Sequence, residues 1–124
     1  MEKTLVDSEL KVMNVIWRNG DIPARQVAQI LTDTYGWNMN TTYTLIKRCI
    51  RKGAVQRIEP NFVCRALISK ERVQEQSAKE LIDKIFDGSA GLLFAALVNQ
   101  NSLSPQDIQK LKEQIEQAEN EAQS

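Results

Sequence analysis

The alternation of apolar and polar positions predicts two amphipathic helices near the start of the chain. Residues 8–19 and residues 23–34 each carry apolar side chains at the three- and four-residue spacing of one helix face. Ser8 is the expected N-cap of the first helix and Gly20 its expected left-handed end, while Pro23 suits the first position of the second helix. The two apolar stripes consist of Leu10, Met13, Ile16 and Trp17, and of Val27, Ile30 and Leu31.

A third helix, expected over residues 39–52, divides its side chains between an apolar face and a polar, basic face. Asn38 is its expected cap, Gly36 the left-handed residue before it, and Gly53 its end. The apolar face consists of Thr42, Leu45, Ile46, Cys49 and Ile50. The polar face consists of Asn40, Thr41, Tyr43, Thr44, Lys47, Arg48 and Arg51. One side can therefore pack into a domain while the other stays free for a partner.

Two short strand-like segments follow this helix. They span residues 54–59 and residues 62–68, and Pro60 and Asn61 between them are turn-forming residues. Three helices followed by a β-hairpin is the element order of a winged helix-turn-helix domain. Such a domain places the polar face of its last helix in the major groove of DNA.

The rest of the chain is expected to be helical, with polar loops between three helices. The segments are residues 71–86, residues 90–99 and a last helix that Ser104 caps. Residues 90–99 are apolar on nearly every side, which predicts that this helix is buried. The last residues, 119–124, are expected to fray.

Three short helices of this kind cannot form a core alone, so the apolar helix needs something to pack against. A two-fold dimer in which these helices interlock would cover it, and we favour this arrangement over folding back onto the preceding domain. The predicted dimerisation residues are Leu81, Ile85, Leu92, Leu93, Leu97, Ile108, Leu111 and Ile115. The sequence thus predicts a mainly α protein, with a winged helix-turn-helix DNA-binding domain over residues 1–70 and a helical dimerisation region over residues 71–124.

The formal net charge is zero, but the two predicted regions carry opposite charges. Residues 1–70 hold 11 Lys and Arg against 6 Asp and Glu, a net +5, and residues 71–124 hold 5 against 10, a net −5. An anion-binding module followed by a region that avoids anions would explain this asymmetry. A solvated, Glu-rich helix is the alternative for the second region. Double-stranded DNA is therefore the expected partner of the first region.

The third helix offers both kinds of group that a DNA-reading helix needs. Cations bind phosphates and position the protein, whereas small polar side chains near the helix start meet base edges. The candidates for phosphate contact are Lys47, Arg48, Arg51 and Lys52. The candidates for base contact are Asn40, Thr41, Tyr43 and Thr44. Arg57 in the hairpin could reach a flanking phosphate or the minor groove. A merely solvated basic face is the alternative.

The residues present give no support to an enzyme or a metalloprotein. The chain has no histidine, no CxxC pair and no glycine-rich phosphate loop, so we expect neither catalysis nor a bound metal or other cofactor. Cys49 and Cys64 stand in apolar surroundings and are expected to be reduced core residues. The apolar run 90–98 is shorter than the ~20 residues that cross a bilayer, and the first residues form no targeting segment. A cytoplasmic protein without membrane insertion is expected.

Four stretches of the chain, taken together, resemble a known family. They are residues 41–53 (TTYTLIKRCIRKG), residues 8–17 (SELKVMNVIW), residues 86–88 (FDG) and residues 103–108 (LSPQDI). All are similar to the BlaI/MecI/CopY penicillinase-repressor family, and the resemblance covers nearly the whole chain. It implies a winged-helix repressor that binds a two-fold operator as a homodimer, upstream of antibiotic-resistance or copper-handling genes. It also implies a membrane sensor peptidase as partner, whose action leads to cleavage at a position matching Ala96–Leu97.

The chain departs from the family pattern at several positions. It lacks the Asn-Phe pair of the family's cleavage position and the CxCxxxxCxC tail of copper-sensing members. Asn40 and Tyr43 stand where the penicillinase repressors carry basic residues. The resemblance implies base contact for Thr41 and Thr44. It implies phosphate contact for Arg48 and, by extension, for Arg51 and Lys52. We therefore expect a related but altered operator.

A protein-interaction adaptor that keeps the winged-helix fold without binding DNA is the rival interpretation. An adaptor has no need for a row of cations on one face of its third helix, so the basic face favours the DNA-binding interpretation. DNA binding that weakens steeply with added salt would separate the two.

Overall fold

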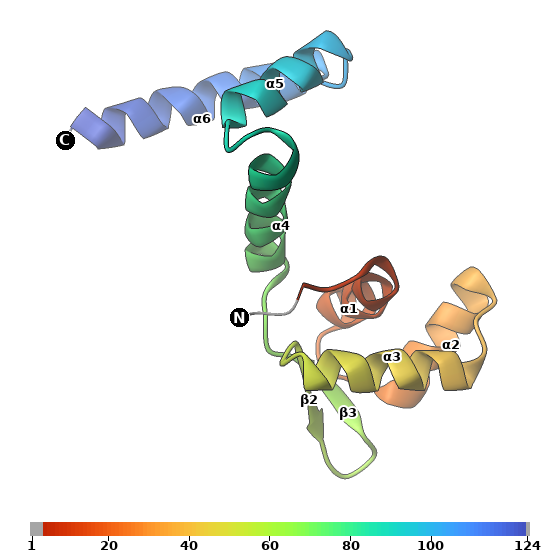
Figure 1. The fold of residues 1–124 in the computed structure, drawn as a ribbon. Helices are drawn as coiled ribbons and strands as arrows, with labels where there is room; N and C mark the ends of the chain where they lie inside the picture. Colours follow the sequence, from red (N-terminus) through yellow and green to blue (C-terminus); the bar gives the residue numbers. More distant parts are fainter. Residues whose placement is uncertain (1–3, 124) are drawn as a thin grey trace. The chain divides into compact units, whose positions relative to one another are not determined.

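The computed structural model describes residues 4–123 and divides into two compact units between Gln76 and Ser77. The first unit contains α1 (Asp7–Asn19), β1 (Ile22–Pro23), α2 (Ala24–Tyr35), α3 (Met39–Arg51), β2 (Val55–Ile58) and β3 (Val63–Ala66) (Figure 1). Helix α4 (Lys70–Ile85) begins in the first unit and ends in the second, which also contains α5 (Ala90–Asn99) and α6 (Pro105–Gln123). The predicted mainly α fold with a winged-helix unit is confirmed.

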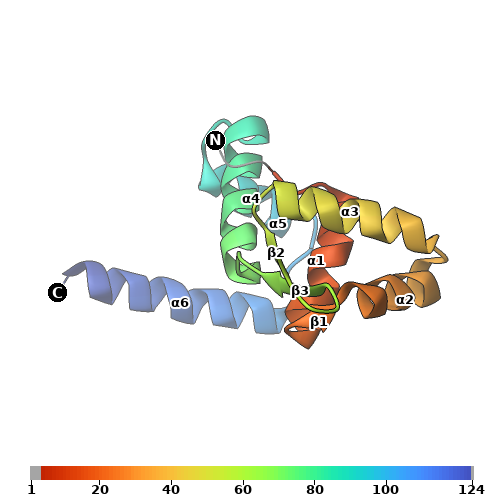
Figure 2. The ribbon, with the colours of Figure 1, turned by 90° about the horizontal axis from the view of Figure 1, so that it is seen from below.

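Helices α1, α2 and α3 pack against one another and against the small sheet around one apolar core (Figure 2). The buried apolar residues are Val12, Met13, Val15, Ile16, Ile22, Ala24, Val27, Leu31, Leu45, Ile46, Cys49, Ala54, Val55 and Cys64. Trp17 and Ile30, both expected in the apolar stripes, lie half-buried at the edge of this core. The indole N–H of Trp17 donates to the Ile68 carbonyl at 2.9 Å, which ties the end of the hairpin region to α1.

The three strands form an antiparallel sheet in the order β1-β3-β2. Cys64 of β3 is paired with Ile22 of β1, and both side chains are buried against the helices. Residues of β2 and β3 pair from Val55 opposite Ala66 to Ile58 opposite Val63. The predicted strands are confirmed but shorter than expected, and their turn projects beyond the helices as the wing (Figure 1).

The local signals for the start of α3 are confirmed. Gly36 has φ 73° and ψ 20°, the left-handed conformation in which glycine is favoured. The side-chain oxygen of Asn38 accepts the backbone N–H of Asn40 at 2.7 Å, so this asparagine caps the helix as predicted. Gly53 also has a positive φ, 79°, just after the helix ends.

Two expected helix starts were wrong by a residue or two. Helix α1 is capped at Val6 and not at Ser8, because the Glu9 carboxylate accepts the Val6 N–H at 3.0 Å and satisfies that donor. Pro23 lies in β1 and caps α2 instead of opening it, because its extended backbone is part of the sheet. Gly20 has the expected positive φ of 75°, but its ψ of −153° is not that of a left-handed helical turn.

Thr42 is a polar residue inside the core whose hydroxyl has no hydrogen-bond partner among the described residues. A buried hydroxyl without a partner costs free energy, and valine has nearly the same shape. We expect Thr42→Val to raise the free energy of unfolding by about 1 kcal/mol, measured by urea denaturation. The exposed Thr44→Val is the control and should change it by less than about 0.5 kcal/mol. A loss of stability in Thr42→Val would show that the hydroxyl is satisfied in solution.

Both helices that belong wholly to the second unit begin with side-chain caps. Ser89 accepts the N–H of Leu92 at 3.2 Å at the start of α5. Ser104 caps α6 as the sequence predicted, since its hydroxyl oxygen accepts the Asp107 N–H, and the Asp107 carboxylate in turn accepts the Ser104 N–H. The fraying expected over residues 119–124 stays a prediction, and α6 continues to Gln123 in the described residues. Strong helix formers explain this, because its last turns are rich in Glu, Gln and Ala.

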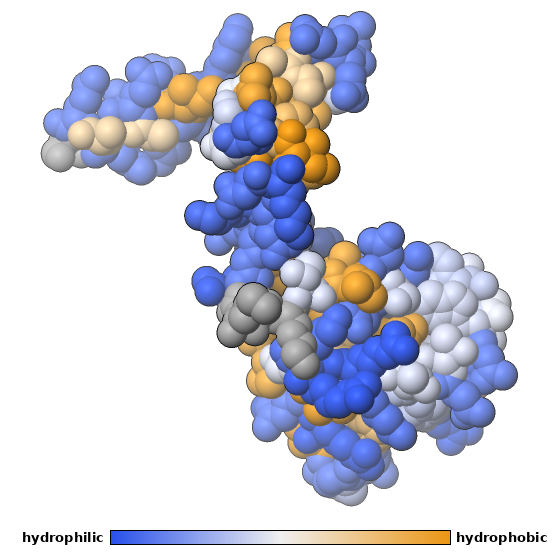
Figure 3. Space-filling model, in the orientation of Figure 1, coloured by the Kyte–Doolittle hydropathy of each residue, from blue (hydrophilic) through white to orange (hydrophobic). Residues whose placement is uncertain are grey.

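Helix α5 is not buried in the single chain, so its expected burial stays a prediction that requires a partner. No residue of this helix is buried, and Leu92, Phe94 and Val98 are 50 %, 41 % and 58 % exposed. Figure 3 shows the hydrophobic residues gathered on the surface of this unit. The helices of the second unit are too few to enclose the apolar side chains of α5, which therefore remain open to a partner. Among the described helices, none combines the length and the apolar character that a membrane span requires.

Candidate nucleic-acid interface

The outward face of α3 presents the polar and basic residues that the sequence singled out. Its opposite face is fixed in the core by Thr42, Leu45, Ile46 and Cys49, which are all buried. The residues left exposed, at helical spacing, are Asn40, Thr41, Thr44, Lys47, Arg48 and Arg51. Tyr43 differs from them, since its ring is half-buried and packs against the core. The structure thus brings six of the nine predicted contact residues onto one exposed face of one helix.

The N-terminal turn of this face carries small polar groups. The Thr44 hydroxyl donates to the Asn40 carbonyl at 3.0 Å, so its proton is used within the helix. Its methyl group and oxygen lone pairs remain available, which suits a thymine methyl or a base amino group. The side chain of Asn40 is exposed and can both donate and accept, as adenine recognition requires.

The C-terminal half of the face carries uncompensated positive charge. Lys47, Arg48 and Arg51 are exposed and form no ion pair within the described residues. Their N–H groups are therefore free to meet an external anion without first breaking an internal contact. Exposed cations of this kind, on a helix that is itself fixed by a core, are suited to DNA phosphates.

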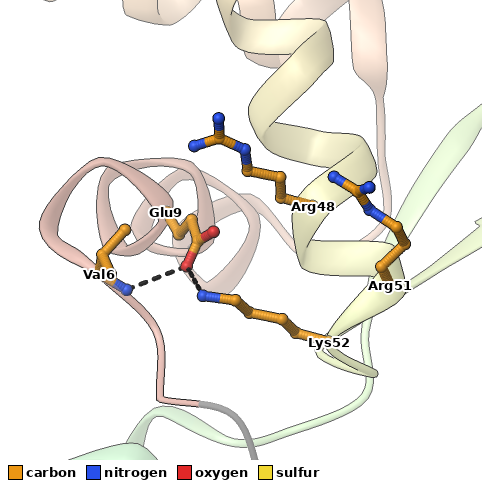
Figure 4. A pocket seen from close by; sticks show the side chains of 5 residues that line it. All are labelled: Val6, Glu9, Arg48, Arg51 and Lys52. Atoms are coloured by element: carbon orange, nitrogen blue, oxygen red, sulfur yellow. Dashed lines mark hydrogen bonds and ion pairs between the residues drawn. The ribbon is translucent and has the colours of Figure 1, made fainter.

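Lys52, by contrast, is a cation that already has an ion-pair partner. Its ammonium nitrogen lies 2.5 Å from Glu9 Oε1 and 2.9 Å from the carbonyl oxygen of Thr4, and its side chain is only 19 % exposed (Figure 4). The Glu9 side chain is 1 % exposed. Lys52 thus joins the end of α3 to the start of α1, and its charge is already paired. Sequence reasoning missed this because Glu9 is distant along the chain.

A cavity of about 350 Å³ lies between these two helix ends. It is lined by Val6, Glu9, Arg48, Arg51 and Lys52. In Figure 4 the guanidinium groups of Arg48 and Arg51 extend from α3 on the side that carries Glu9, and neither is joined to its carboxylate. The Glu9–Lys52 pair therefore fixes the helix end from which the two arginines project.

The Glu9 carboxylate makes the Glu9–Lys52 ion pair sensitive to acid. Burial favours the neutral form of the Glu9 carboxyl group and by itself would raise its pKa. Two hydrogen bonds, from Lys52 and from the Val6 N–H, favour the charged form, as do the positive charges of Lys52 and Arg48. Together they outweigh burial and lower the pKa of Glu9 below 4.5. A carboxyl group with a lowered folded-state pKa stabilises the fold fully above its unfolded value. That stabilisation is lost as the pH falls through the folded-state value.

We expect Glu9→Gln to lower the free energy of unfolding by about 2 kcal/mol near pH 7, since it leaves Lys52 without its partner. The difference between the two proteins should shrink as the pH falls from 4.5 through the lowered folded-state pKa of Glu9, where wild-type Glu9 becomes protonated as well. Urea denaturation across this range measures it. Glu59→Gln is the control, because Glu59 is an exposed acid whose pair with Arg57 should contribute under about 1 kcal/mol. A difference that does not depend on pH would contradict the assignment.

Contacts within the wing hold Arg57 in a defined place. Arg57 forms an ion pair with Glu59, and its guanidinium carbon lies 3.8 Å from the centre of the Phe62 ring. The Phe62 ring in turn lies 6.1 Å from that of Tyr43 on α3. Sequence reasoning named Arg57 and Tyr43 but missed Phe62, for which an aromatic residue next to the hairpin turn was the available signal.

A second ion pair anchors the wing at its base. The guanidinium of Arg65 on β3 lies 2.6 Å from the carboxylate of Asp21, just before β1. Both side chains are exposed, so the pair aligns the strands more than it stabilises them.

The two cysteines are structural. Both are free and buried, and burial raises the pKa of Cys49 to about 12 and that of Cys64 to about 11. They are therefore neutral thiols at physiological pH, as predicted for core residues. The described residues include no cluster of three or more His, Cys, Asp and Glu side chains that could hold a metal ion.

The amino-acid sequence matches known proteins over most of its length. The family model of the penicillinase repressor matches residues 5–117. The penicillinase repressor of Bacillus licheniformis is 27 % identical over 116 residues, which cover 92 % of this chain and 91 % of that protein.

Two solved structures resemble part of the chain. One is the solution structure of the DNA-binding domain of the repressor BlaI, with a TM-score of 0.52 and 34 % identity over 56 % of this chain and 90 % of that one. The other is the monomeric form of Bacillus licheniformis BlaI in complex with the blaP half-operator, with a TM-score of 0.51 and 32 % identity over 57 % of this chain and 89 % of that one.

Proposed function

Because this chain belongs to the penicillinase repressor family, we propose that it represses transcription by binding a two-fold DNA operator as a homodimer. The family is one of transcriptional repressors and not of enzymes. Each protomer would place α3 in the major groove of one half-site. Half-sites should then lie about one or two helical turns apart, each ~10–10.5 base pairs.

The observation that carries this proposal is the unpaired basic face of α3. Lys47, Arg48 and Arg51 are exposed and without ion pairs among the described residues, while the same helix is fixed in the core by its other face. The BlaI monomer solved in complex with the blaP half-operator aligns with 57 % of this chain at 32 % identity, which supports the same use of the exposed face of α3 here.

We assign separate roles along α3. Asn40, Thr41 and Thr44 meet base edges, while Lys47, Arg48 and Arg51 bind phosphates. Lys52 is left out of the contact set because Glu9 holds it. Tyr43 is assigned mainly to packing, because its ring is half-buried. The resemblance implies basic residues in the penicillinase repressors at the positions of Asn40 and Tyr43, so we propose an operator sequence that differs from theirs.

Dimerisation is assigned to the second unit. Its exposed apolar residues need a cover, and an identical face on a second copy would supply one. Of the predicted dimerisation residues, those most exposed in the single chain are Leu81, Ile85, Leu92, Ile108 and Ile115, whereas Leu93, Leu97 and Leu111 are half-buried. Phe94 and Val98, which the prediction omitted, join the exposed set.

Release from DNA is proposed to follow cleavage of the C-terminal region. The position implied by the resemblance, Ala96–Leu97, lies inside α5, so a protease needs this helix to open locally. A cut there would separate α6 from the DNA-binding unit and divide the apolar face assigned to the dimer. A membrane sensor peptidase is the proposed upstream partner. Mass spectrometry of the protein from induced cells tests this step, and a fragment ending at Ala96 is expected. Full-length protein after induction would contradict it.

Selection from a random duplex library tests the proposal as a whole. The full-length protein should enrich a two-fold symmetric sequence with half-sites one or two helical turns apart. Enrichment of a single unrepeated half-site would contradict the dimer on DNA. No enrichment by folded protein would contradict sequence-specific binding.

A further inference from the structure

We propose that Phe62 is a positioning residue for DNA binding, whose ring holds Arg57 ready to contact a backbone phosphate beside the half-site. The ring also links that arginine to α3 through Tyr43. This inference rests on the proposed function, since it concerns the same DNA interface.

Phe62 is fixed by both its backbone and its side chain. Its carbonyl oxygen accepts the N–H of Ala24, the first residue of α2, at 2.9 Å. Its ring is half-buried and packs against the core of the first unit. Phe62 is therefore a rigid point in the turn of the wing, attached to the helices that orient α3.

The ring of Phe62 covers one face of the Arg57 guanidinium. The guanidinium carbon stands 3.8 Å from the ring centre, within stacking distance. Glu59 accepts the Nε–H of the same group. Of the five N–H donors of an arginine, the four terminal ones remain, and no hydrogen bond within the described residues joins them. Arg57 thus presents a preoriented edge of donors.

Position matters more than charge for this arginine. Glu59 compensates the charge of Arg57, so its long-range attraction for DNA is weak. Any contribution has to come from short-range hydrogen bonds to a phosphate, which depend on where the guanidinium is held. A freely moving Arg57 would lose side-chain entropy on binding, whereas a stacked one has already lost it.

Tyr43 connects this arrangement to the base-reading helix. Its ring lies 6.1 Å from that of Phe62 at an angle of 59°, a tilted aromatic contact between α3 and the wing. The stack of Tyr43, Phe62 and Arg57 therefore fixes the distance between the base contacts of α3 and the phosphate contact of the wing.

A double-mutant cycle on the full-length protein tests this role. Phe62→Leu keeps an apolar side chain but removes the stacking surface, and leucine avoids a β-branch at a position with φ 48°. We expect it to weaken binding to the selected operator about fivefold, as Arg57→Ala should, with little change in the salt slope because Glu59 already compensates the charge of Arg57. In the Arg57→Ala background, Phe62→Leu should have no further effect on affinity. Phe62→Tyr, which keeps the ring, should retain wild-type affinity.

Two results would overturn the inference. One is an equal loss from Phe62→Leu with and without Arg57, which would mean that the ring acts only on the fold. The other is a Phe62→Leu protein that binds the operator with wild-type affinity. If Phe62→Leu unfolds, the NMR chemical shifts of the Arg57 side-chain protons in the wild-type protein test the stacking instead. A stacked guanidinium shows a ring-current shift, and the absence of that shift would overturn the inference. Failure of the wild-type protein to bind any DNA would instead overturn the proposed function.

Discussion

The double variant Arg48→Ala, Arg51→Ala is expected to bind its operator about 100-fold more weakly than the wild-type protein. Each guanidinium is exposed and has no ion pair within the described residues, so its charge-assisted hydrogen bonds to phosphates form without breaking an internal pair. Such a contact contributes about 1.5 kcal/mol or more, which is about tenfold in affinity for each arginine. Fluorescence anisotropy with labelled operator at several salt concentrations measures the loss.

The salt dependence distinguishes a lost phosphate contact from a damaged fold. Removing two phosphate contacts should reduce the slope of log affinity against log salt concentration by about two. The melting temperature should stay within about 2 °C of wild type, because both side chains are exposed. Lys110→Ala, Lys112→Ala removes the same charge from α6 and serves as the matched control, with little expected change. An unchanged salt slope in the arginine variant would contradict the assignment.

Charges placed on the apolar face of α5 are expected to convert the dimer into monomers. Leu92 and Phe94 are 50 % and 41 % exposed in the single chain, and the proposed dimer buries them. Leu92→Asp, Phe94→Asp would then place two carboxylates in an apolar interface, which costs several kcal/mol. Operator affinity should fall by about 100-fold or more, since the second half-site is no longer bound in an intramolecular step. Analytical ultracentrifugation reports the assembly state.

A control variant separates the effect of the face from that of added charge. Gln100→Asp, Asn101→Asp adds the same charge in the polar loop after α5, and it should remain dimeric. Binding of the Leu92→Asp, Phe94→Asp protein to a single half-site should be unaffected, because the DNA-binding residues lie in the other unit. A variant that stays dimeric would show that α5 lies outside the interface.

The parts of the fold that depend on neighbouring residues were predictable from the sequence. The two faces of α3 follow from side-chain spacing, and its start follows from Gly36 and the Asn38 cap. The exposed row from Asn40 to Arg51 follows from the same spacing. These signals are local, since each involves residues within about two helical turns of one another.

The parts that depend on long-range pairs were not predictable. Lys52 reads as one more cation of α3, and only the fold reveals that Glu9 holds it. Phe62 reads as a strand residue, although the turn of the wing brings its ring to Arg57 and Tyr43. The apolar character of α5 was plain from the sequence, but periodicity does not specify what covers such a helix.

The central claim is that this chain binds DNA through α3, and DNA upstream of its own gene tests that claim most directly. We predict tight binding by the full-length protein at low salt, a steep loss of affinity as salt is added, and a large loss in Arg48→Ala. A folded dimer that does not bind this DNA or random DNA at low salt would contradict the account. It would instead favour an adaptor that keeps the winged-helix fold without using it on DNA.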